Sequence, residues 1–390
     1  MLDRIYIHYT KHGLGSLILS AIAYVYNNYV APPERLAKSV ELIQPSRIIN
    51  ATYKGVSDAS TPKHLQKTVG RIKIDSRKVY FFNDVSILPT ESNSTIYSGI
   101  FPFDPITTNP KIVKLPRINW NFYIRNIFST NKKPDTSLAI LISEKHSLGY
   151  SHWLTEVITQ FRIIDELGYD KNNLDIVFMW GGREKKMALW QKETMEYFEF
   201  APDFLKSDGL VRASELVVPS YTTLASYIPN YPSSSDLKWI RERAHNLIDS
   251  SAKHPKRLFV SRQKSGRRKI SNLVEIENIL TKYGFDIIYP ENLSVKEQIN
   301  LFSTAEVIMG PHGGGLMNMI FSIDALIIEL LADHEACHHQ FVLSNLLGLD
   351  YEFILCETVQ DSHNKKRHMD LIIDPNRLKF ILEHYCGKDI

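Results

Sequence analysis

The sequence has little of what marks several protein classes. It holds only three cysteines in 390 residues (Cys337, Cys356, Cys386), too few for a disulfide framework and suited to a reducing compartment. Its 46 basic residues are balanced by 43 acidic ones, and a net charge of +3 is too small to indicate nucleic-acid binding. With 44% hydrophobic and 23% charged residues, the composition is that of an ordinary soluble enzyme with two or three domains.

Long apolar runs are also scarce. The segment from Leu14 to Val25 is mostly apolar, but it is too short to span a bilayer and lacks a clear small-x-small cleavage site. An amphipathic helix fits better, either packed on the protein or resting on a membrane surface. We therefore expect a packed helix, with peripheral membrane contact through residues 4–30 as the alternative.

The first third of the chain predicts short antiparallel strands. Residues 31–135 are rich in Pro, Ser, Thr and Asn, and alternating runs occur at Arg71–Asp75 and Lys78–Phe82. Residues 136–235 instead alternate strand and helix, which predicts a parallel sheet. The predicted elements there are strands at Leu138–Ile142, Asp175–Trp180 and Leu216–Pro219 and helices at Ser151–Leu167 and Ala188–Phe198.

A segment with two prolines and a serine cluster, residues 227–236, marks the best domain boundary. We expect an N-terminal domain over 1–235, made of a β-rich extension (1–135) and an α/β part (136–235), and a C-terminal α/β domain over 236–390. The C-terminal elements are predicted as strands at Arg257–Arg262, Phe285–Tyr289, Glu306–Met309, Leu326–Glu329 and Tyr351–Cys356 and helices at Ser271–Tyr283, Val295–Ser303, His339–Leu347 and Asn376–Tyr385. Two doubly wound domains of this kind are expected to face each other across a cleft.

A run of three glycines, Gly313, Gly314 and Gly315, lies where a predicted strand passes into a helix. Residues without Cβ let a ligand approach the backbone, and a helix start favours an anion such as phosphate. His312 can donate to the same anion, and Glu329, predicted to end the next strand, can accept from ribose hydroxyls. The alternative is a glycine turn with a structural histidine and a solvated glutamate.

A basic loop follows the first C-terminal strand and contains Arg262, Lys264, Arg267, Arg268 and Lys269. Loops at the carboxyl edge of a parallel sheet line its ligand site, and guanidinium groups there can bind a diphosphate in a bidentate way. The sequence has no clear Asp-x-Asp motif, so a metal-bound diphosphate is not indicated, and the basic loop could neutralise that charge instead. The alternative is a solvated surface loop.

His152 and Glu156 stand four residues apart at the start of a predicted helix with Ser151 as its N-cap, so they share one helix face. Such a histidine could act as general base on a hydroxyl, with the carboxylate orienting or replacing it. Which of the two is the base stays open. The alternative is a histidine that only caps the helix.

His334, Glu335 and His338 match the H-E-x-x-H pattern of zinc proteases. That pattern requires both histidines on one helical turn and a third ligand. Here it directly follows a strand and a short loop, and Cys337, His339 and His363 offer no defined third ligand. A zinc hydrolase is therefore the less favoured alternative, and no metal or other cofactor is expected.

Three segments resemble glycosyltransferase family 61 (the DUF563 type), whose bacterial members are often described as capsular polysaccharide biosynthesis proteins. Ser151–Glu156 is similar to the family's His-Trp-Leu-x-Glu element, and Arg257–Asn272 is similar to its Ser-Arg and Arg-x-Ile-x-Asn pattern. Leu293–Glu329 is similar to the family's run that contains Gly-x-His-Gly-Ala-Gly-Leu-x-Asn. The resemblance implies a GT-B fold and an inverting, metal-independent transfer of a hexosyl or pentosyl group. The implied donor is a nucleotide sugar, commonly a UDP-sugar, and the implied acceptor is a glycan or lipid-linked glycan.

Carried over by position, the resemblance assigns His152 and Glu156 to catalysis. The donor side would comprise Arg262, Arg267, Arg268, Asn272, His312, Gly313, Gly314, Gly315, Asn318 and Glu329. Gly314 stands where the family usually has Ala, and the region before residue 135 matches no known pattern. A cytoplasmic location is expected, with membrane contact at the inner face of the bacterial plasma membrane. The alternative from another class is a non-catalytic sugar-nucleotide-binding or scaffold protein.

Overall fold

The computed structural model describes residues 33–56, 69–89, 94–98, 101–103, 133–143, 149–170, 175–179, 187–200, 205–206, 211–220, 222, 231–249, 251–332, 338–359 and 369–387. The chain is mixed α/β and forms two compact units. Unit 1 comprises Met1–Arg47, Asp75–Met187 and Phe200–Pro232, and unit 2 comprises Ile48–Ile74, Ala188–Glu199 and Ser233–Ile390. The predicted division into domains at residue 235 stays a prediction.

Unit 1 is built on an eight-stranded sheet with the order β6-β5-β4-β10-β7-β8-β9, and β1 pairs with β4. The strands are β1 (Ser39–Gln44), β4 (Arg77–Pro89), β5 (Ser94–Ser98), β6 (Phe101–Phe103), β7 (Thr136–Ser143), β8 (Asp175–Met179), β9 (Leu205–Lys206) and β10 (Val211–Pro219). The parallel pairing predicted for residues 136–235 is confirmed for β10 with β7, β7 with β8 and β8 with β9.

Of the strands before residue 135, β1, β4, β5 and β6 do not form a separate extension, because β4 pairs with β10 in antiparallel fashion and so joins them to the same sheet. The N-terminal sheet is therefore mixed, where a parallel one was predicted. Consecutive residues Val79 to Phe82 are all buried, so both faces of β4 are covered. Such a strand belongs inside a sheet rather than at its edge.

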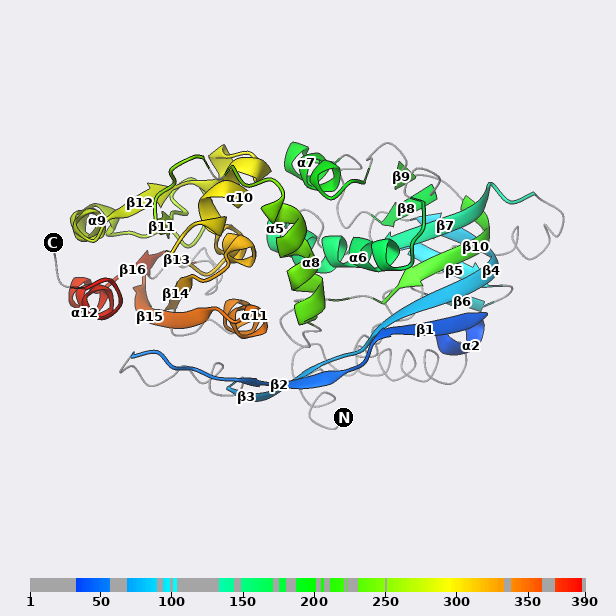
Figure 1. Ribbon diagram of the computed structural model, residues 1–390, viewed down its shortest axis with the longest axis horizontal. Helices are drawn as coiled ribbons and strands as arrows, with labels where there is room; N and C mark the ends of the chain where they lie inside the picture. The colour runs from blue at the N-terminus through cyan, green and yellow to red at the C-terminus, as the bar shows by residue number, and fades with distance from the viewer. Residues whose placement is uncertain are drawn as a thin grey trace. The chain divides into compact units, whose positions relative to one another are not determined.

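Helical structure in unit 1 includes α2 (Pro33–Leu36) and one longer segment beside the sheet. That segment consists of α5 (Tyr150–His152), the π-helix η3 (Trp153–Val157) and α6 (Ile158–Glu166), and α6 runs along the sheet in Figure 1. Its apolar positions Trp153, Val157 and Phe161 are fully buried, as the helical spacing predicts. The predicted helix is thus confirmed, although its first turns are not regular α-helix.

Unit 2 contains a six-stranded sheet with the order β12-β11-β13-β14-β15-β16. Its strands are β11 (Arg257–Val260), β12 (Phe285–Ile288), β13 (Val307–Pro311), β14 (Leu326–Ala332), β15 (Asp350–Thr358) and β16 (Leu371–Ile372). All are parallel except β16. Numbered along the chain, the parallel strands run 2-1-3-4-5, which is a strand order of doubly wound α/β proteins.

Helices cover both faces of this sheet. Figure 1 shows α9 (Leu273–Lys282) and α12 (Pro375–Cys386) on one face and α10 (Val295–Ser303) and α11 (His339–Leu347) on the other. Unit 2 also contains α7 (Leu189–Tyr197), α8 (Ser234–His245) and the 3-10 helices η5 (Pro290–Asn292) and η6 (Gly315–Phe321). The predicted bounds of α10 and α11 are confirmed to the residue.

Local sequence explains these elements. Ser294 and Glu297 form a capping box that starts α10, with the Glu297 carboxylate accepting from the Ser294 N–H at 2.7 Å. β14 carries the run Leu-Ile-Ile-Glu-Leu-Leu-Ala, and all of its residues after the first are buried, as expected of a central parallel strand. The strand continues to Ala332, so the prediction that Glu329 ends it is wrong.

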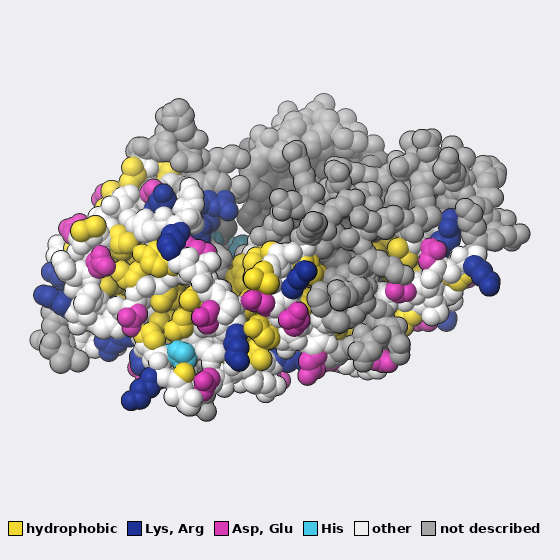
Figure 2. Space-filling model, turned by 90° about the horizontal axis from the view of Figure 1, so that it is seen from above, with side chains coloured by type: hydrophobic (Ala, Val, Ile, Leu, Met, Phe, Trp, Pro, Cys, Tyr) yellow, Lys and Arg dark blue, Asp and Glu magenta, His cyan; other side chains and the backbone are white. Residues whose placement is uncertain are grey.

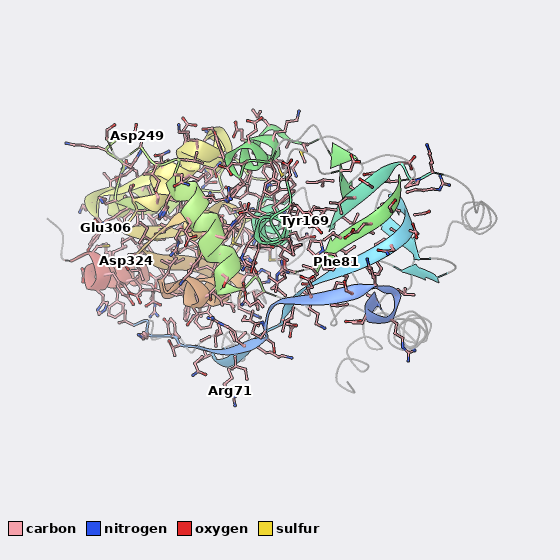
Figure 3. The ribbon with its side chains drawn as sticks, turned by 45° about the vertical axis from the view of Figure 1, so that its right-hand side comes forward. Arg71, Phe81, Tyr169, Asp249, Glu306 and Asp324 are labelled. Carbon is pink, nitrogen blue, oxygen red and sulfur yellow. The ribbon has the colours of Figure 1, made fainter. Side chains whose placement is uncertain are left out.

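The two edges of this sheet differ in character. Glu306 and Asp324, labelled in Figure 3, come directly before β13 and β14 and mark the amino edge. Arg262 and His312 follow β11 and β13 and therefore lie at the opposite, carboxyl edge.

The surface carries charge of both signs. On the face shown in Figure 2, basic, acidic and apolar side chains are interspersed over the described surface, which agrees with the small net charge. No helix among the described residues is long and apolar enough to cross a membrane. The segment 4–30 lies outside the described residues.

A segment from before residue 75 is tied into unit 2. It contains β2 (Arg47–Ala51) and β3 (Gly70–Ile74), which form a small two-stranded sheet. Between them, the Tyr53 hydroxyl and the Val56 N–H donate to the fully buried carboxylate of Glu352, the latter at 2.7 Å. The Tyr385 hydroxyl of α12 donates to the same carboxylate at 3.1 Å. Glu352 thus holds three parts of unit 2 together.

Candidate functional site

The strand order of unit 2 has one reversal point. From β11 the chain passes to β12 on one side and then to β13 on the other. The loops that leave the carboxyl ends of β11 and β13 therefore diverge, and open α/β sheets bind ligands in the crevice that results. The basic loop (residues 261–269) and the glycine turn (residues 312–315) occupy these two positions, so the structure brings both predicted features to one place.

The glycine turn packs directly on the end of β11. A Cβ atom at Gly313 would lie 2.1 Å from Nη1 of Arg262, and one at Gly315 would lie 3.0 Å from Cγ1 of Val260. Any side chain at Gly313 would therefore displace the guanidinium group. The glycines allow the close approach between turn and loop that the sequence predicts, although at Gly313 the group that approaches is Arg262 itself.

Arg262 has an unusual electrostatic environment. Burial, together with repulsion from the guanidinium groups of Arg268 and Arg267, lowers its pKa to about 10. Its Nε donates to the Arg267 carbonyl oxygen at 3.3 Å. The charge of the Glu291 carboxylate raises the pKa of Arg262 in part, but among the described residues no carboxylate forms an ion pair with it. A half-buried cation with other cations beside it and no paired carboxylate is suited to bind an anion.

The rest of the basic loop is fastened on both sides. The Lys264 ammonium lies 4.8 Å from the ring centre of Tyr289, which follows β12. The Lys269 N–H donates to the Asp370 carboxylate at 2.8 Å. Arg268 adopts a left-handed backbone with φ of 57°, a conformation uncommon for a residue with a side chain. The loop is thus held in one conformation across the carboxyl edge.

Asn272 secures the end of this loop. Its side-chain amide donates to the Ile373 carbonyl at 2.8 Å and to the Glu275 carboxylate at 3.0 Å, and its Oδ1 accepts from the Ile373 N–H at 3.0 Å. Both donors of the amide are therefore engaged by the protein. The structure places Asn272 as an anchor and does not bring it to the glycine turn.

His312 is held by a buried carboxylate. Its Nδ1 lies 2.6 Å from Oε1 of Glu329, and the hydroxyl of Tyr351 donates to Oε2 of Glu329 at 2.6 Å. Burial and the Glu329 charge raise the pKa of Tyr351 well above its usual value, so this hydroxyl keeps its proton. Glu329 is fully buried and both its oxygens have protein partners. It therefore positions His312, whereas the sequence predicted that its carboxylate would accept from ribose hydroxyls in the crevice.

The helix after the glycines differs from the prediction. Residues 315–321 form a short 3-10 helix, and β14 follows at Leu326. The expected stabilisation of an anion by an α-helix dipole is therefore not available here. Gly314 is the N-cap of this turn, and the Asn318 amide donates to Gln298 of α10 at 2.7 Å and to the Gly315 carbonyl at 3.2 Å. Asn318 thus fixes the turn to the neighbouring helix.

In unit 1, His152 and Glu156 form the predicted pair. Nδ1 of His152 lies 2.8 Å from Oε1 of Glu156, and the glutamate is fully buried while 26% of the histidine side chain is exposed. Burial lowers the pKa of His152, but the hydrogen bond to Glu156 and its charge outweigh that effect and raise the pKa above the usual value. Of the two side chains, only His152 reaches solvent.

A π-helix sets the spacing of this pair. The Thr155 carbonyl accepts hydrogen bonds from the hydroxyls of Thr159 and Thr222, both at 3.0 Å, and the Glu156 carbonyl accepts from the Gln160 amide at 2.7 Å. Side chains that bond to helix carbonyls can widen a helix locally, and such π turns are frequent at functional sites. The N-cap is Gly149, so the predicted cap at Ser151 is wrong.

The zinc-protease pattern gains no support from the described residues. His334 and Glu335 lie outside them, and His338 stands before α11 as its N-cap, not on a helical turn. No group of three His, Cys, Asp or Glu side chains in the described part of the chain could hold a metal ion.

Comparison with known proteins relates part of this chain to one family. Residues 150–328 match the model of the family described as Glycosyltransferase 61, a span that runs from the His152 helix through the basic loop and the glycine turn. Over this span, the chain is similar to glycosyltransferase family 61. Over 132 residues it is 28% identical to a protein of Oryza sativa subsp. japonica named beta-1,2-xylosyltransferase XAX1. That match covers 32% of this chain and 23% of the rice protein.

Proposed function

We propose that the protein is an inverting, metal-independent glycosyltransferase that moves a sugar from a nucleotide sugar to a hydroxyl group of a glycan. A UDP-sugar is the proposed donor. The family match supports transfer in general, and the name of the rice relative supports a pentosyl group such as xylose as readily as a hexosyl group.

One observation carries the donor side of this proposal. Arg262 lies against the glycine turn at the reversal point of the sheet, and among the described residues no carboxylate forms an ion pair with it, although the Glu291 charge acts on it. A diphosphate supplies the missing negative charge, and the guanidinium group can bind it in a bidentate way. Because charge develops on the diphosphate as it leaves, the same arginine would stabilise the transition state without a metal ion.

The catalytic side rests on His152. Residue types alone leave His152 and Glu156 equal as candidate bases, but Glu156 is fully buried, which favours His152 as the group that meets the acceptor. In the proposed step, Nε2 of His152 takes the proton from the acceptor hydroxyl. The oxygen attacks the anomeric carbon, the bond from that carbon to the phosphate oxygen breaks, and the nucleoside diphosphate leaves with the electron pair. A single displacement inverts the anomeric centre.

We propose a GT-B division of labour, in which unit 2 binds the donor and unit 1 presents the acceptor. By analogy with bacterial family members, the acceptor would be a growing surface or capsular glycan, or a lipid-linked one. The proposed location is the cytoplasm, at the inner face of the plasma membrane, with residues 4–30 as the contact.

The first test is a thermal-shift screen with UDP-, GDP-, dTDP- and CMP-sugars on the wild type, Arg262→Ala and Lys256→Ala. Lys256 lies at the amino edge, where it pairs with Glu306 at 3.5 Å, so its variant removes a positive charge far from the site. One donor should raise the melting temperature of the wild type and of Lys256→Ala, because it binds only the folded state. The shift should shrink in Arg262→Ala, and an undiminished shift there would contradict the donor assignment.

Turnover separates an enzyme from a binding protein. With the donor found in the screen, the wild type should release nucleoside diphosphate slowly even without acceptor, and His152→Ala should not. A protein that binds donors tightly but never releases the diphosphate with any acceptor glycan would be a scaffold rather than a transferase.

A further inference from the structure

A buried glutamine beside the glycine turn has an acceptor that no described residue uses. Gln340 is the second residue of α11, and only 1% of it is exposed. Its Nε2 donates to the carbonyl oxygen of Gly313 at 3.4 Å. Its Oε1 is buried and accepts no hydrogen bond from any described residue. The side chain therefore reaches the same turn that packs on Arg262.

The position of Gln340 is fixed by its helix. Phe341, Val342 and Leu343, which follow it, are fully buried. The preceding His339 places its ring centre 6.2 Å from that of His312. The glutamine thus belongs to the surroundings of the glycine turn, although it comes from an element that starts beyond β14.

An acceptor left without a donor is costly. Roughly 90% or more of buried polar groups have a hydrogen-bond partner, because a buried group without one loses the hydrogen bonds that water would give it. A bound molecule that supplies a donor would recover this loss, so an Oε1 without a donor among the described residues indicates part of a binding site.

The chemistry of the amide oxygen selects the donor group. Diphosphate oxygens are ionised at neutral pH and only accept hydrogen bonds, so they cannot satisfy Oε1. A sugar hydroxyl can. Two side chains beside the turn thus have different partners: Arg262 can bind an anion, and Gln340 can accept a hydrogen bond from a hydroxyl group. A nucleotide sugar supplies both the anion and the hydroxyl group, whereas inorganic pyrophosphate supplies only the anion.

We propose that Gln340 Oε1 accepts a hydrogen bond from a hydroxyl group of the bound donor, on either its ribose or its transferred sugar. This proposal rests on the proposed function and adds a residue that recognises the carbohydrate part of the substrate. It assigns Gln340 to binding rather than to catalysis.

The test is isothermal titration calorimetry with inorganic pyrophosphate, UDP, UDP-glucose and UDP-xylose on the wild type, Gln340→Met, Gln340→Ala and Arg262→Ala. Methionine keeps the volume but offers no amide, and alanine leaves room for water. Pyrophosphate binding within about twofold of wild type would show that each Gln340 variant is folded and keeps its anion site. Loss of one such hydrogen bond should weaken the hydroxyl-bearing ligands roughly five- to thirtyfold.

The pattern of losses locates the hydroxyl. If UDP is already weakened by Gln340→Met, the donor group belongs to the nucleoside, and comparison with 2′-deoxy-UDP then tests the ribose 2′-hydroxyl. If only a UDP-sugar is weakened, the hydroxyl belongs to the transferred sugar. Unchanged affinity for UDP and both UDP-sugars, or an equal loss for pyrophosphate, would overturn the role of Gln340. Undiminished pyrophosphate binding by Arg262→Ala, or no binding of any probe by the wild type, would instead contradict the proposed function.

Discussion

Each unit of this protein holds one histidine against a fully buried glutamate, yet the two pairs are built differently. His152 and Glu156 are four residues apart on one helical segment, joined at 2.8 Å. His312 directly follows β13, and Glu329 lies in the middle of the next strand, β14. Nδ1 of His312 lies 2.6 Å from Oε1 of Glu329. The first histidine is 26% exposed in its side chain and the second 10%.

The residues around the two His–Glu pairs favour different roles for them. His312 precedes Gly313, against which Arg262 packs, so its pair lies beside a cluster of cations and is suited to hold an anion. His152 stands on a helix lined by threonine and glutamine, and its raised pKa comes from Glu156. In our proposal, the same two residue types thus support donor binding in one unit and proton transfer in the other.

The largest expected effect separates the two histidines. His152→Ala should lower kcat about 10²- to 10⁴-fold, the usual contribution of a general base, and leave the donor Kd unchanged. His312→Ala should instead raise the donor Kd about tenfold, since it removes a hydrogen bond to a charged ligand. Steady-state kinetics with calorimetry would measure both, and equal losses in kcat and Kd for the two variants would remove the distinction.

The next effect tests the contact between turn and loop. Gly313→Ala should weaken donor binding by about ten- to a hundredfold, because the new methyl group displaces the Arg262 guanidinium. Gly266→Ala in the same loop is the matched control, since a Cβ there meets nothing within 4 Å. A donor Kd in Gly313→Ala equal to that of the control would show that Arg262 need not lie against the turn.

A smaller effect compares the two buried glutamates of neighbouring strands. Tyr351→Phe leaves one oxygen of Glu329 without its donor and should lower the free energy of unfolding by about 1–3 kcal/mol. Because Glu329 holds His312, donor affinity should fall as well. Tyr385→Phe removes one of several donors to Glu352 and should cost less stability and no donor affinity. Chemical denaturation would measure the stability of both variants, and calorimetry would measure their donor affinity. Equal losses of donor affinity in the two variants would contradict the role given to Glu329.

The smallest effect concerns pH. The proposed base must be neutral, so kcat should rise as pH increases through the raised pKa of His152. In Glu156→Gln the contributions that raise this pKa are lost while burial still lowers it, and the acid limb of the profile should move to lower pH. A limb that stays in place would assign it to another group.

The same shift predicts a change in stability. His152 has a higher pKa folded than unfolded, so its protonation stabilises the fold below the unfolded pKa, and this contribution is lost as pH rises through the folded pKa. The stability advantage of the wild type over Glu156→Gln should therefore shrink as pH rises from the usual histidine pKa of about 6.5 through the raised folded pKa of His152. Denaturation curves across that range would show an unchanged difference if the pair does not form.

Local sequence predicts much of unit 2. The capping box of Ser294 and Glu297 and the continuous apolar runs of the strands are short-range signals, and α10 and the parallel sheet follow them. The rule that loops meet at the carboxyl edge also places Arg262 beside the glycine turn without any knowledge of contacts.

Other features depend on residues far apart in the chain. β4 joins its sheet by pairing Val79 with Pro219 and Ile87 with Val211, which no local pattern reveals. Residues 153–157 have the sequence pattern of an ordinary amphipathic helix. The hydrogen bond from the Thr222 hydroxyl to the Thr155 carbonyl in this π-helix comes from another segment, so the local pattern does not predict it. Tyr351 and Gln340 were missed for the same reason, since their roles are defined only by Glu329 and Gly313, which lie in other elements.

The central claim is that unit 2 holds the donor between the loops after β11 and β13. Hydrogen–deuterium exchange with and without the nucleotide sugar that most raises the melting temperature tests it directly. We expect slower exchange of the amides in residues 261–269 and 312–318 and little change at the amino edge around Glu306 and Asp324. Protection that appears elsewhere while these two segments exchange as before would contradict the account.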